Sequence, residues 1–221
     1  MDYRHFLLIF MFINIYQLLN AQNMDGKSFT PTEINAIMEA DTSKEMRVLK
    51  ITNYVDSVFL RMSSMPVKPD TQDIVLNHFI ARLYKTVTHP NSLGVGIAAP
   101  QVGIPRQIIL VQRFDKEAFP FECYLNIKIV AYSDSTKLTT EGCLSIPEYR
   151  AVVERPDFVE IEYDRIDGSH HKETVTGFTS VIFQHEVDHL NGILYLDHLK
   201  DELYQRKQQK RKTEMLNPAP K

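Results

Sequence analysis

The feature that most constrains the fold is a pair of histidines, His185 and His189, in the segment Gln184-His185-Glu186-Val187-Asp188-His189. Residues four apart on an α-helix lie one turn apart on the same face, so both imidazole rings can reach one metal ion. Glu186 projects about 100° round the helix from His185, close enough to act on water at that ion. Apolar residues frame the pair at Val181, Ile182, Leu190 and Leu194. The sequence therefore predicts a largely buried helix over 179–190 that can carry a metal site.

A catalytic metal site commonly has three protein ligands and one solvent molecule, so two histidines leave it one ligand short. Cys143 is the candidate third ligand, in the segment Glu141-Gly142-Cys143-Leu144-Ser145-Ile146-Pro147, where Gly142 permits tight backbone geometry beside the sulfur. The chain has one other cysteine, Cys123, and the two can instead form a disulfide in an oxidising compartment. Two histidines four apart also occur by chance on polar surface helices. Both alternatives stay open on these residues alone.

A third segment is rich in small residues and ends in a side-chain amide: Gly94-Val95-Gly96-Ile97-Ala98-Ala99-Pro100-Gln101. It lacks the lysine of a P-loop and the complete glycine pattern of a dinucleotide site, so it is not a phosphate cradle. Taken alone, it is typical of a turn packed tightly in the core.

The remaining pattern mixes helices and strands. Apolar residues recur at helical spacing over 74–87, Thr30-Pro31 can start a short helix, and Asp167-Gly168 is a hairpin turn. Strands are predicted over 108–112, 124–132 and 158–163. These elements predict an α+β fold.

Composition narrows the functional classes. Lys and Arg number 25 against 28 Asp and Glu, a net charge of −3, which excludes nucleic-acid binding through overall charge. Two cysteines exclude a disulfide-dense scaffold and a four-cysteine zinc module.

The N-terminus has the pattern of a secretory signal peptide over residues 1–21. A basic start with Arg4 is followed by a short apolar run and a small residue, Ala21. The run is shorter than the roughly 20 residues of a membrane-spanning helix. We therefore expect export to the periplasm or the medium, and no transmembrane domain in the mature chain. The alternatives are an uncleaved membrane anchor, or a cytoplasmic protein that starts at Met24 or Met46.

The three segments, beginning at Gly94, Glu141 and Gln184, together resemble the signature motifs of peptide deformylases, in the family's order. The resemblance covers roughly residues 46–205. It implies antiparallel β-strands packed around a central metal-binding α-helix. It also implies an activity: removal of the N-terminal formyl group from formyl-methionyl peptides or nascent chains.

The resemblance assigns roles to individual residues. Cys143, His185 and His189 would hold one divalent ion, Fe²⁺ in much of the family, although Zn²⁺, Ni²⁺ or Co²⁺ can occupy such a site. Water at the ion would attack the formyl carbonyl, with Glu186 as general acid and base. The Gln101 side-chain amide and the Leu144 backbone N–H match the family's donors to the developing oxyanion. Substrate-binding positions are Gly94, Val95, Gly96, Gly142, Val181 and Ile182.

Other expectations concern supporting residues and the rest of the chain. Asp188 is expected to orient a neighbour rather than bind the ion, and Glu141 to pair with Arg155. Residues 22–45 form an N-terminal extension, 46–205 the catalytic domain and 206–221 a basic tail that can contact the ribosome. Two competing functions remain: a metalloprotease, which shares the histidine spacing, and a catalytically inactive binding protein.

Overall fold

The computed structural model describes residues 28–92 and 94–199; the predicted signal peptide and the basic tail lie outside them. The helices are α2 (Pro31–Met38), α3 (Tyr54–Phe59), α4 (Ile74–Val87) and α5 (Gly177–Leu190), with 3₁₀ turns η1 (Ala99–Val102) and η2 (Tyr195–His198). The strands are β1 (Gly96–Ala98), β2 (Ile108–Gln112), β3 (Phe121–Tyr132), β4 (Thr136–Cys143), β5 (Ile146–Pro156), β6 (Phe158–Asp164) and β7 (His170–Thr176). Within the described ranges, every helix is too short or too polar to cross a bilayer.

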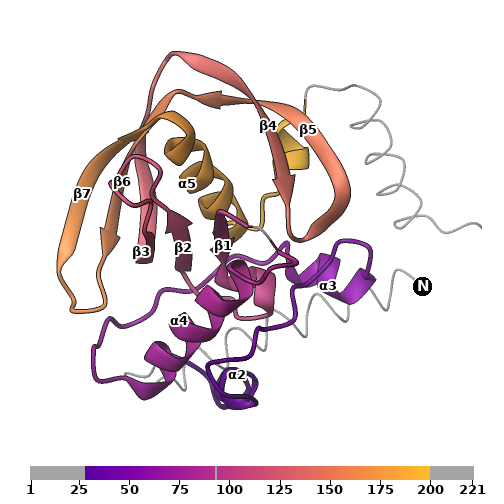
Figure 1. Ribbon diagram of the computed structural model, residues 1–221, viewed down its shortest axis with the longest axis vertical. Coiled ribbons are helices and arrows are strands. Elements are labelled where there is room, and N and C mark those ends of the chain that lie inside the picture. Colours follow the sequence, from indigo (N-terminus) through magenta and orange to yellow (C-terminus); the bar gives the residue numbers. More distant parts are fainter. Residues whose placement is uncertain (1–27, 93, 200–221) are drawn as a thin grey trace, which may run out of the picture.

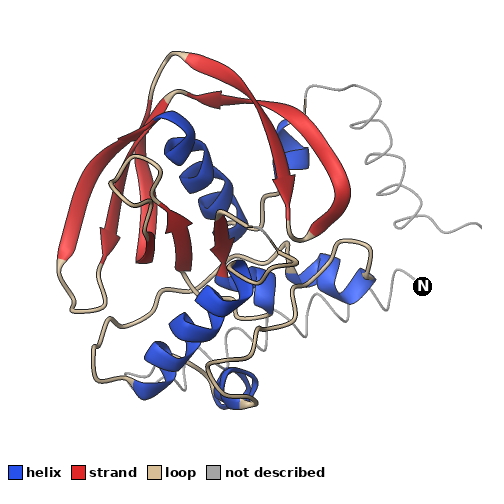
Figure 2. Ribbon diagram, viewed as in Figure 1, coloured by secondary structure: helices blue, strands red, loops and turns tan. Residues whose placement is uncertain are grey.

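The strands form two antiparallel sheets. Five strands pair in the order β1-β2-β3-β6-β7, and β4 pairs with β5 in a separate two-stranded ribbon. Helix α5 lies between the larger sheet and the ribbon, as Figure 1 shows, while α2 and α4 lie together at the other end of the molecule. The predicted α+β architecture, with antiparallel strands around one central helix, is confirmed (Figure 2).

Helix α5 begins at a glycine and is closely followed by another, and the backbone of both lies in the left-handed region. Gly177 at its start and Gly192 just after its end both have a positive φ, of 67° and 70°. A Cβ at Gly192 would lie 2.3 Å from the carbonyl oxygen of Arg61, so only glycine fits there. The helix between them is mostly buried, including Val181, Ile182, Phe183, Val187 and Leu190. The prediction of a buried helix that ends near residue 190 is confirmed.

Strand β6 shows why the larger sheet is recognisable in the sequence. Val159, Ile161 and Tyr163 are buried on one face while the residues between them are more exposed. Gly168, with φ of 82°, turns the chain into β7, as the Asp167-Gly168 pair predicts. The alternation places an apolar face of the sheet against α5.

The described part of the N-terminal extension packs into the core rather than beside it. Thr30 and Glu33 form a reciprocal capping box at the start of α2. Glu33 also makes a buried ion pair with Arg106, 2.7 Å between Oε2 and Nη2. Arg82 of α4 is 1% exposed, and its guanidinium donates to four backbone carbonyls of the extension. Those carbonyls belong to Ala36, Ile37, Lys44 and Glu45.

Candidate metal centre

The structure brings the three predicted ligands together. His185 and His189 extend from one face of α5, with ring centroids 5.0 Å apart. Cys143, the last residue of β4, places its Sγ 3.2 Å from Nε2 of His189. One side-chain atom from each of the three lies within 4.8 Å of the other two. Cys123, on β3, and Cys143 are both free, so the disulfide alternative is wrong.

A carboxylate behind the site fixes the orientation of His185. Glu141 Oε2 lies 2.7 Å from Nδ1 of His185. This contact fixes the ring so that its other nitrogen, Nε2, faces away from the carboxylate. Arg155 donates to both oxygens of Glu141, at 2.7 and 3.1 Å, so the predicted Glu141–Arg155 pair is confirmed. Burial alone raises the pKa of Glu141, but its bonds with His185 and Arg155 outweigh it and lower that pKa to about 2.

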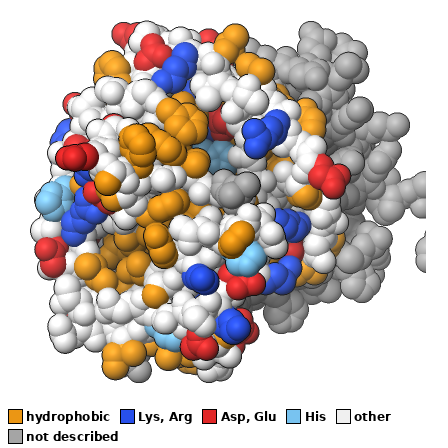
Figure 3. All heavy atoms as spheres, in the orientation of Figure 1, with side chains coloured by type: hydrophobic (Ala, Val, Ile, Leu, Met, Phe, Trp, Pro, Cys, Tyr) orange, Lys and Arg blue, Asp and Glu red, His pale blue; other side chains and the backbone are white. Residues whose placement is uncertain are grey.

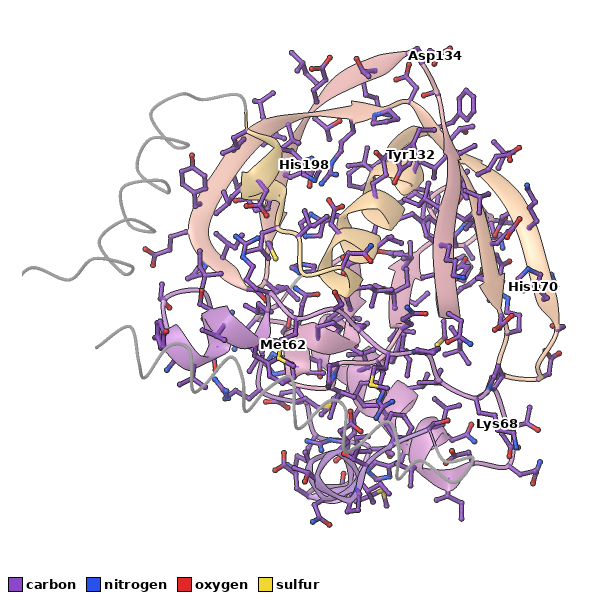
Figure 4. All side chains as sticks on the ribbon, turned by 180° about the vertical axis from the view of Figure 1, so that it is seen from behind. Met62, Lys68, Tyr132, Asp134, His170 and His198 are labelled. Atoms are coloured by element: carbon purple, nitrogen blue, oxygen red, sulfur yellow. The ribbon has the colours of Figure 1, made fainter. Side chains whose placement is uncertain are left out.

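Arg155 also connects the site to the C-terminal end of α5. Arg155 Nη1 donates to Asp188 at 2.7 Å, and His198 Nε2 lies 2.8 Å from the same carboxylate oxygen. Figure 4 labels His198 on the η2 segment. Asp188 thus orients Arg155, which in turn holds Glu141, in agreement with its predicted supporting role.

The surroundings of Cys143 favour its thiolate form. Burial by itself raises the pKa of the thiol, but the charge of His189 and hydrogen bonds with both histidines hold it well below its usual value. The backbone N–H of Ser145 donates to Sγ at 3.3 Å. The Gln101 amide nitrogen approaches the same sulfur to 3.5 Å. A thiolate is the form of cysteine that binds metals.

Glu186 is packed against β1. It is 3% exposed, and burial raises its pKa to about 7 although both histidines oppose the rise. A Cβ built on Gly96 would lie 2.5 Å from Glu186 Oε1 and 2.7 Å from a methyl carbon of Ile182. Gly96 is therefore the residue that makes room for the carboxylate.

The site opens into a cavity of about 830 Å³. Figure 3 shows hydrophobic side chains beside a hollow near the centre of this face. The predicted substrate-binding and oxyanion residues all line the cavity: Gly94, Val95, Gly96, Gln101, Gly142, Leu144, Val181 and Ile182. Gln101 directs its amide nitrogen towards the sulfur because its Oε1 accepts from Ala98 N at 2.9 Å.

Several residues around the site were not predicted from the sequence. Lys50, Arg150 and Phe178 also line the cavity. Tyr195 stacks on the His185 ring with centroids 5.9 Å apart. None of the four falls within one of the three motifs, although Arg150 and Phe178 lie only a few positions from one.

The donor set suits a divalent ion. One thiolate and two imidazoles are ligands that several first-row metals accept, and a 3.2 Å separation of sulfur and nitrogen fits bonds of about 2.0–2.3 Å to one ion. Among the described side chains, the buried atoms His189 Nδ1 and Glu186 Oε2 have no hydrogen-bond partner. A buried carboxylate oxygen without a hydrogen-bond partner, beside three candidate ligand atoms, indicates a site that binds a polar group.

Three residues that could hold a metal ion, beside a buried carboxylate at the floor of an open cavity, are the arrangement of a metal-dependent hydrolase. The family model described as polypeptide deformylase matches residues 48–205. The chain belongs to the peptide deformylase family, and the family implies a divalent metal at this cluster.

Individual relatives agree with this assignment. The chain is 36% identical over 169 residues to a peptide deformylase of Chloroflexus aurantiacus, covering 70% of this chain and 87% of that one. A crystal structure of a class I type b peptide deformylase from Acinetobacter baumannii with Met-Ala-Ser bound is similar, with a TM-score of 0.63 and 32% identity. That match covers 71% of this chain and 99% of the other. The peptide deformylase of Thermotoga maritima gives a TM-score of 0.62 at 31% identity, over 71% and 98% of the two chains.

Proposed function

We propose that the protein hydrolyses the formyl group from the N-terminus of formyl-methionyl peptides. The observation that carries the proposal is the convergence of Cys143, His185 and His189 beside Glu186, in a chain of this family. The Met-Ala-Ser peptide bound to the Acinetobacter baumannii relative begins with methionine, as the product of such a reaction would.

Cys143, His185 and His189 would hold the divalent ion, and Glu141 would keep the His185 ring in place. Such an ion supplies Lewis-acid chemistry at the formyl carbonyl and acidifies water. We infer Fe²⁺ by family resemblance, with Zn²⁺, Ni²⁺ or Co²⁺ as substitutes. Metal analysis of the purified protein tests this choice.

Glu186 is the general acid and base in this proposal. Its buried carboxylate lies beside the ligand cluster, where it can take a proton from the attacking water and pass it to the departing amine. The Gln101 amide and the Leu144 N–H would donate to the oxygen that gains charge as the carbonyl carbon becomes tetrahedral. Losing one such donor costs on the order of 3 kcal/mol of transition-state stabilisation.

The peptide would bind along β1. This strand pairs only with β2 in the sheet and so forms its edge among the described strands. An added strand at this edge is a common mode of peptide recognition. Val95, Val181 and Ile182 would line the pocket for the methionine side chain. An apolar pocket discriminates by only about 1–3 kcal/mol per methylene, so we expect a preference for methionine rather than strict selection.

A deformylation assay separates this function from its rivals. Formyl-Met-Ala-Ser should be hydrolysed, whereas a peptide without a formyl group should remain intact; cleavage inside a blocked peptide would instead identify a metalloprotease. Glu186→Gln should abolish turnover while the protein still binds metal. If the wild-type protein binds formyl peptides but releases no formate, the binding-protein alternative is correct.

Two further proposals concern regions outside the described residues. We infer from the pattern over 1–21 that the protein is exported. The choice of Fe²⁺ above holds for a cytoplasmic protein; in the exported protein zinc or nickel would take its place, because oxygen damages an iron–thiolate site. Mass spectrometry of the mature N-terminus tests export. The basic tail over 206–221 is a candidate ribosome contact, which co-sedimentation of full-length and truncated protein tests.

A further inference from the structure

The segment Leu49-Lys50-Ile51 crosses between two of the three motifs and is bonded to both. The backbone N–H of Leu49 donates to the carbonyl oxygen of Gln101 at 2.7 Å. Two residues on, the N–H of Ile51 donates to the carbonyl oxygen of Ser145 at 3.0 Å. This segment therefore fixes the Gln101 turn relative to the Cys143 loop.

Between these two backbone bonds, the Lys50 ammonium donates to the carbonyl oxygen of Leu144. Lys50 is half-buried and lines the cavity, and 94 positions separate it from Leu144 in the chain. The backbone of Lys50 is held in place because its N–H donates a hydrogen bond to the carboxylate of Asp56 at 2.9 Å. That carboxylate is fixed in turn, since it accepts hydrogen bonds from both terminal nitrogens of Arg47 at 2.8 Å. The ammonium is thus held on one carbonyl by a fixed backbone.

That carbonyl belongs to the same peptide group as the N–H of Ser145, which points at the sulfur of Cys143 at 3.3 Å. A peptide group is planar and conjugated, so a cation on its oxygen draws electrons from its nitrogen and makes the N–H a stronger donor. The positive charge of Lys50 therefore acts on the Cys143 thiolate indirectly, by strengthening the hydrogen bond that the Ser145 N–H donates to it.

We propose that Lys50 is a positioning residue of this site: through the Leu144–Ser145 peptide it strengthens the hydrogen bond to the Cys143 sulfur and fixes the rotation of Leu144. The second effect follows because the Leu144 carbonyl is tied to Lys50 while the next residue, Ser145, is tied to Ile51. The Leu144 N–H, the proposed oxyanion donor, lies in the preceding peptide group, between Cys143 and Leu144. The bond from Ser145 N–H back to the Cys143 sulfur closes a ring around that group, so holding the Leu144–Ser145 peptide in place also limits the rotation of the Leu144 N–H. The kinetic part of this inference rests on the proposed deformylase function; the sulfur–metal part does not.

The test compares Lys50→Met, Lys50→Arg and a matched control, Lys68→Met, in the full chain. Lys68 is exposed, and Figure 4 labels it at the periphery, well away from α5. Each protein is loaded with Co²⁺, and the sulfur-to-cobalt charge-transfer band is recorded. A thiolate with a weaker hydrogen bond gives up an electron more easily, so Lys50→Met should shift this band to longer wavelength. Lys50→Arg should restore it and Lys68→Met should not move it.

Kinetics and hydrogen exchange complete the test. Lys50→Met should lower kcat roughly 10-fold, less than complete loss of an oxyanion donor, and change KM by no more than about 2-fold. Exchange of the Ser145 amide should become faster in the zinc-loaded protein. If Lys50→Met does not fold, Lys50→Gln, which keeps an N–H donor without the charge, replaces it and should shift the band in the same direction.

An unchanged cobalt band in Lys50→Met overturns the inference, as does an effect confined to KM, which would mean that Lys50 contacts substrate directly. Failure of Lys50→Arg to restore the band also contradicts it. If wild-type protein lacks deformylase activity but Lys50→Met still shifts the band, the proposed function fails while the sulfur–metal part stands.

Discussion

Replacing Gly96 by alanine tests whether the position of Glu186 limits the reaction. The added methyl group would lie 2.5 Å from Glu186 Oε1 and 2.7 Å from a carbon of Ile182, where ordinary contacts begin at 3.4 Å. The carboxylate must therefore move by roughly 1 Å, since the backbone of β1 is fixed by its pairing with β2. A misplacement of about 1 Å in a reacting group costs on the order of 10²-fold.

We therefore expect Gly96→Ala to reduce kcat/KM by about 10²-fold, equivalent to about 3 kcal/mol of transition-state stabilisation. Complete loss of a general acid and base would cost up to about 10⁴-fold, which sets the upper limit. The assay is formate release from formyl-Met-Ala-Ser, with metal content measured on the same samples. Metal content should stay at the wild-type level because the ligands lie on other residues.

Gly168→Ala is the matched control. Gly168 lies in the turn between β6 and β7 with φ of 82°, and a Cβ there would meet nothing within 4 Å. Alanine at this position strains the backbone and costs about 1 kcal/mol of stability without affecting turnover. Gly96→Ala with full metal content and more than a third of wild-type kcat/KM would refute the steric reasoning.

Two predictions concern stability. Arg82→Met should lower the free energy of unfolding by at least about 3 kcal/mol in urea, because four backbone carbonyls of the extension lose their donor; a change below 1 kcal/mol would contradict this. Burial alone raises the pKa of Glu122, but bonds with Lys116, Tyr124 and Arg165 lower it to about 2. A lowered carboxyl pKa adds stability above the ordinary value near 4.5, and that contribution disappears as the pH falls from 4.5 towards 2. Glu122→Gln should therefore weaken the acid-induced loss of stability between these pH values, and an unchanged acid denaturation curve would count against it.

The sequence predicted best where a periodic apolar pattern coincides with burial. Helix α4 was predicted over 74–87 and helix α5 over 179–190, and both fold with buried apolar faces. Strand β6 alternates cleanly because one face packs on α5. The three candidate metal-binding residues lie inside short local motifs. The spacing of four paired His185 with His189, but Cys143 joined them only through the resemblance to a family, because the residues alone left a disulfide with Cys123 open.

The ribbon of β4 and β5 escaped prediction because it is exposed. Leu138 and Val152 point outward at 74% and 57% exposure while Val153, next to Val152, is buried, so apolar residues occur on both faces of the ribbon and do not alternate with polar ones. Cross-strand hydrogen bonds, which leave no periodic signal, stabilise it. Contacts such as Lys50 to Leu144 span 94 positions, and only the folded chain reveals them.

The described part of the N-terminal extension belongs to the same folded unit as the residues that follow it. The family model starts at residue 48, yet Phe29, Ile37 and Met46 belong to the same buried cluster as α4. A trimmed version cut at the family boundary would uncover that cluster and leave the Arg82 guanidinium without its four carbonyl acceptors. Expression vectors for this protein should therefore retain the residues from Ser28 onward.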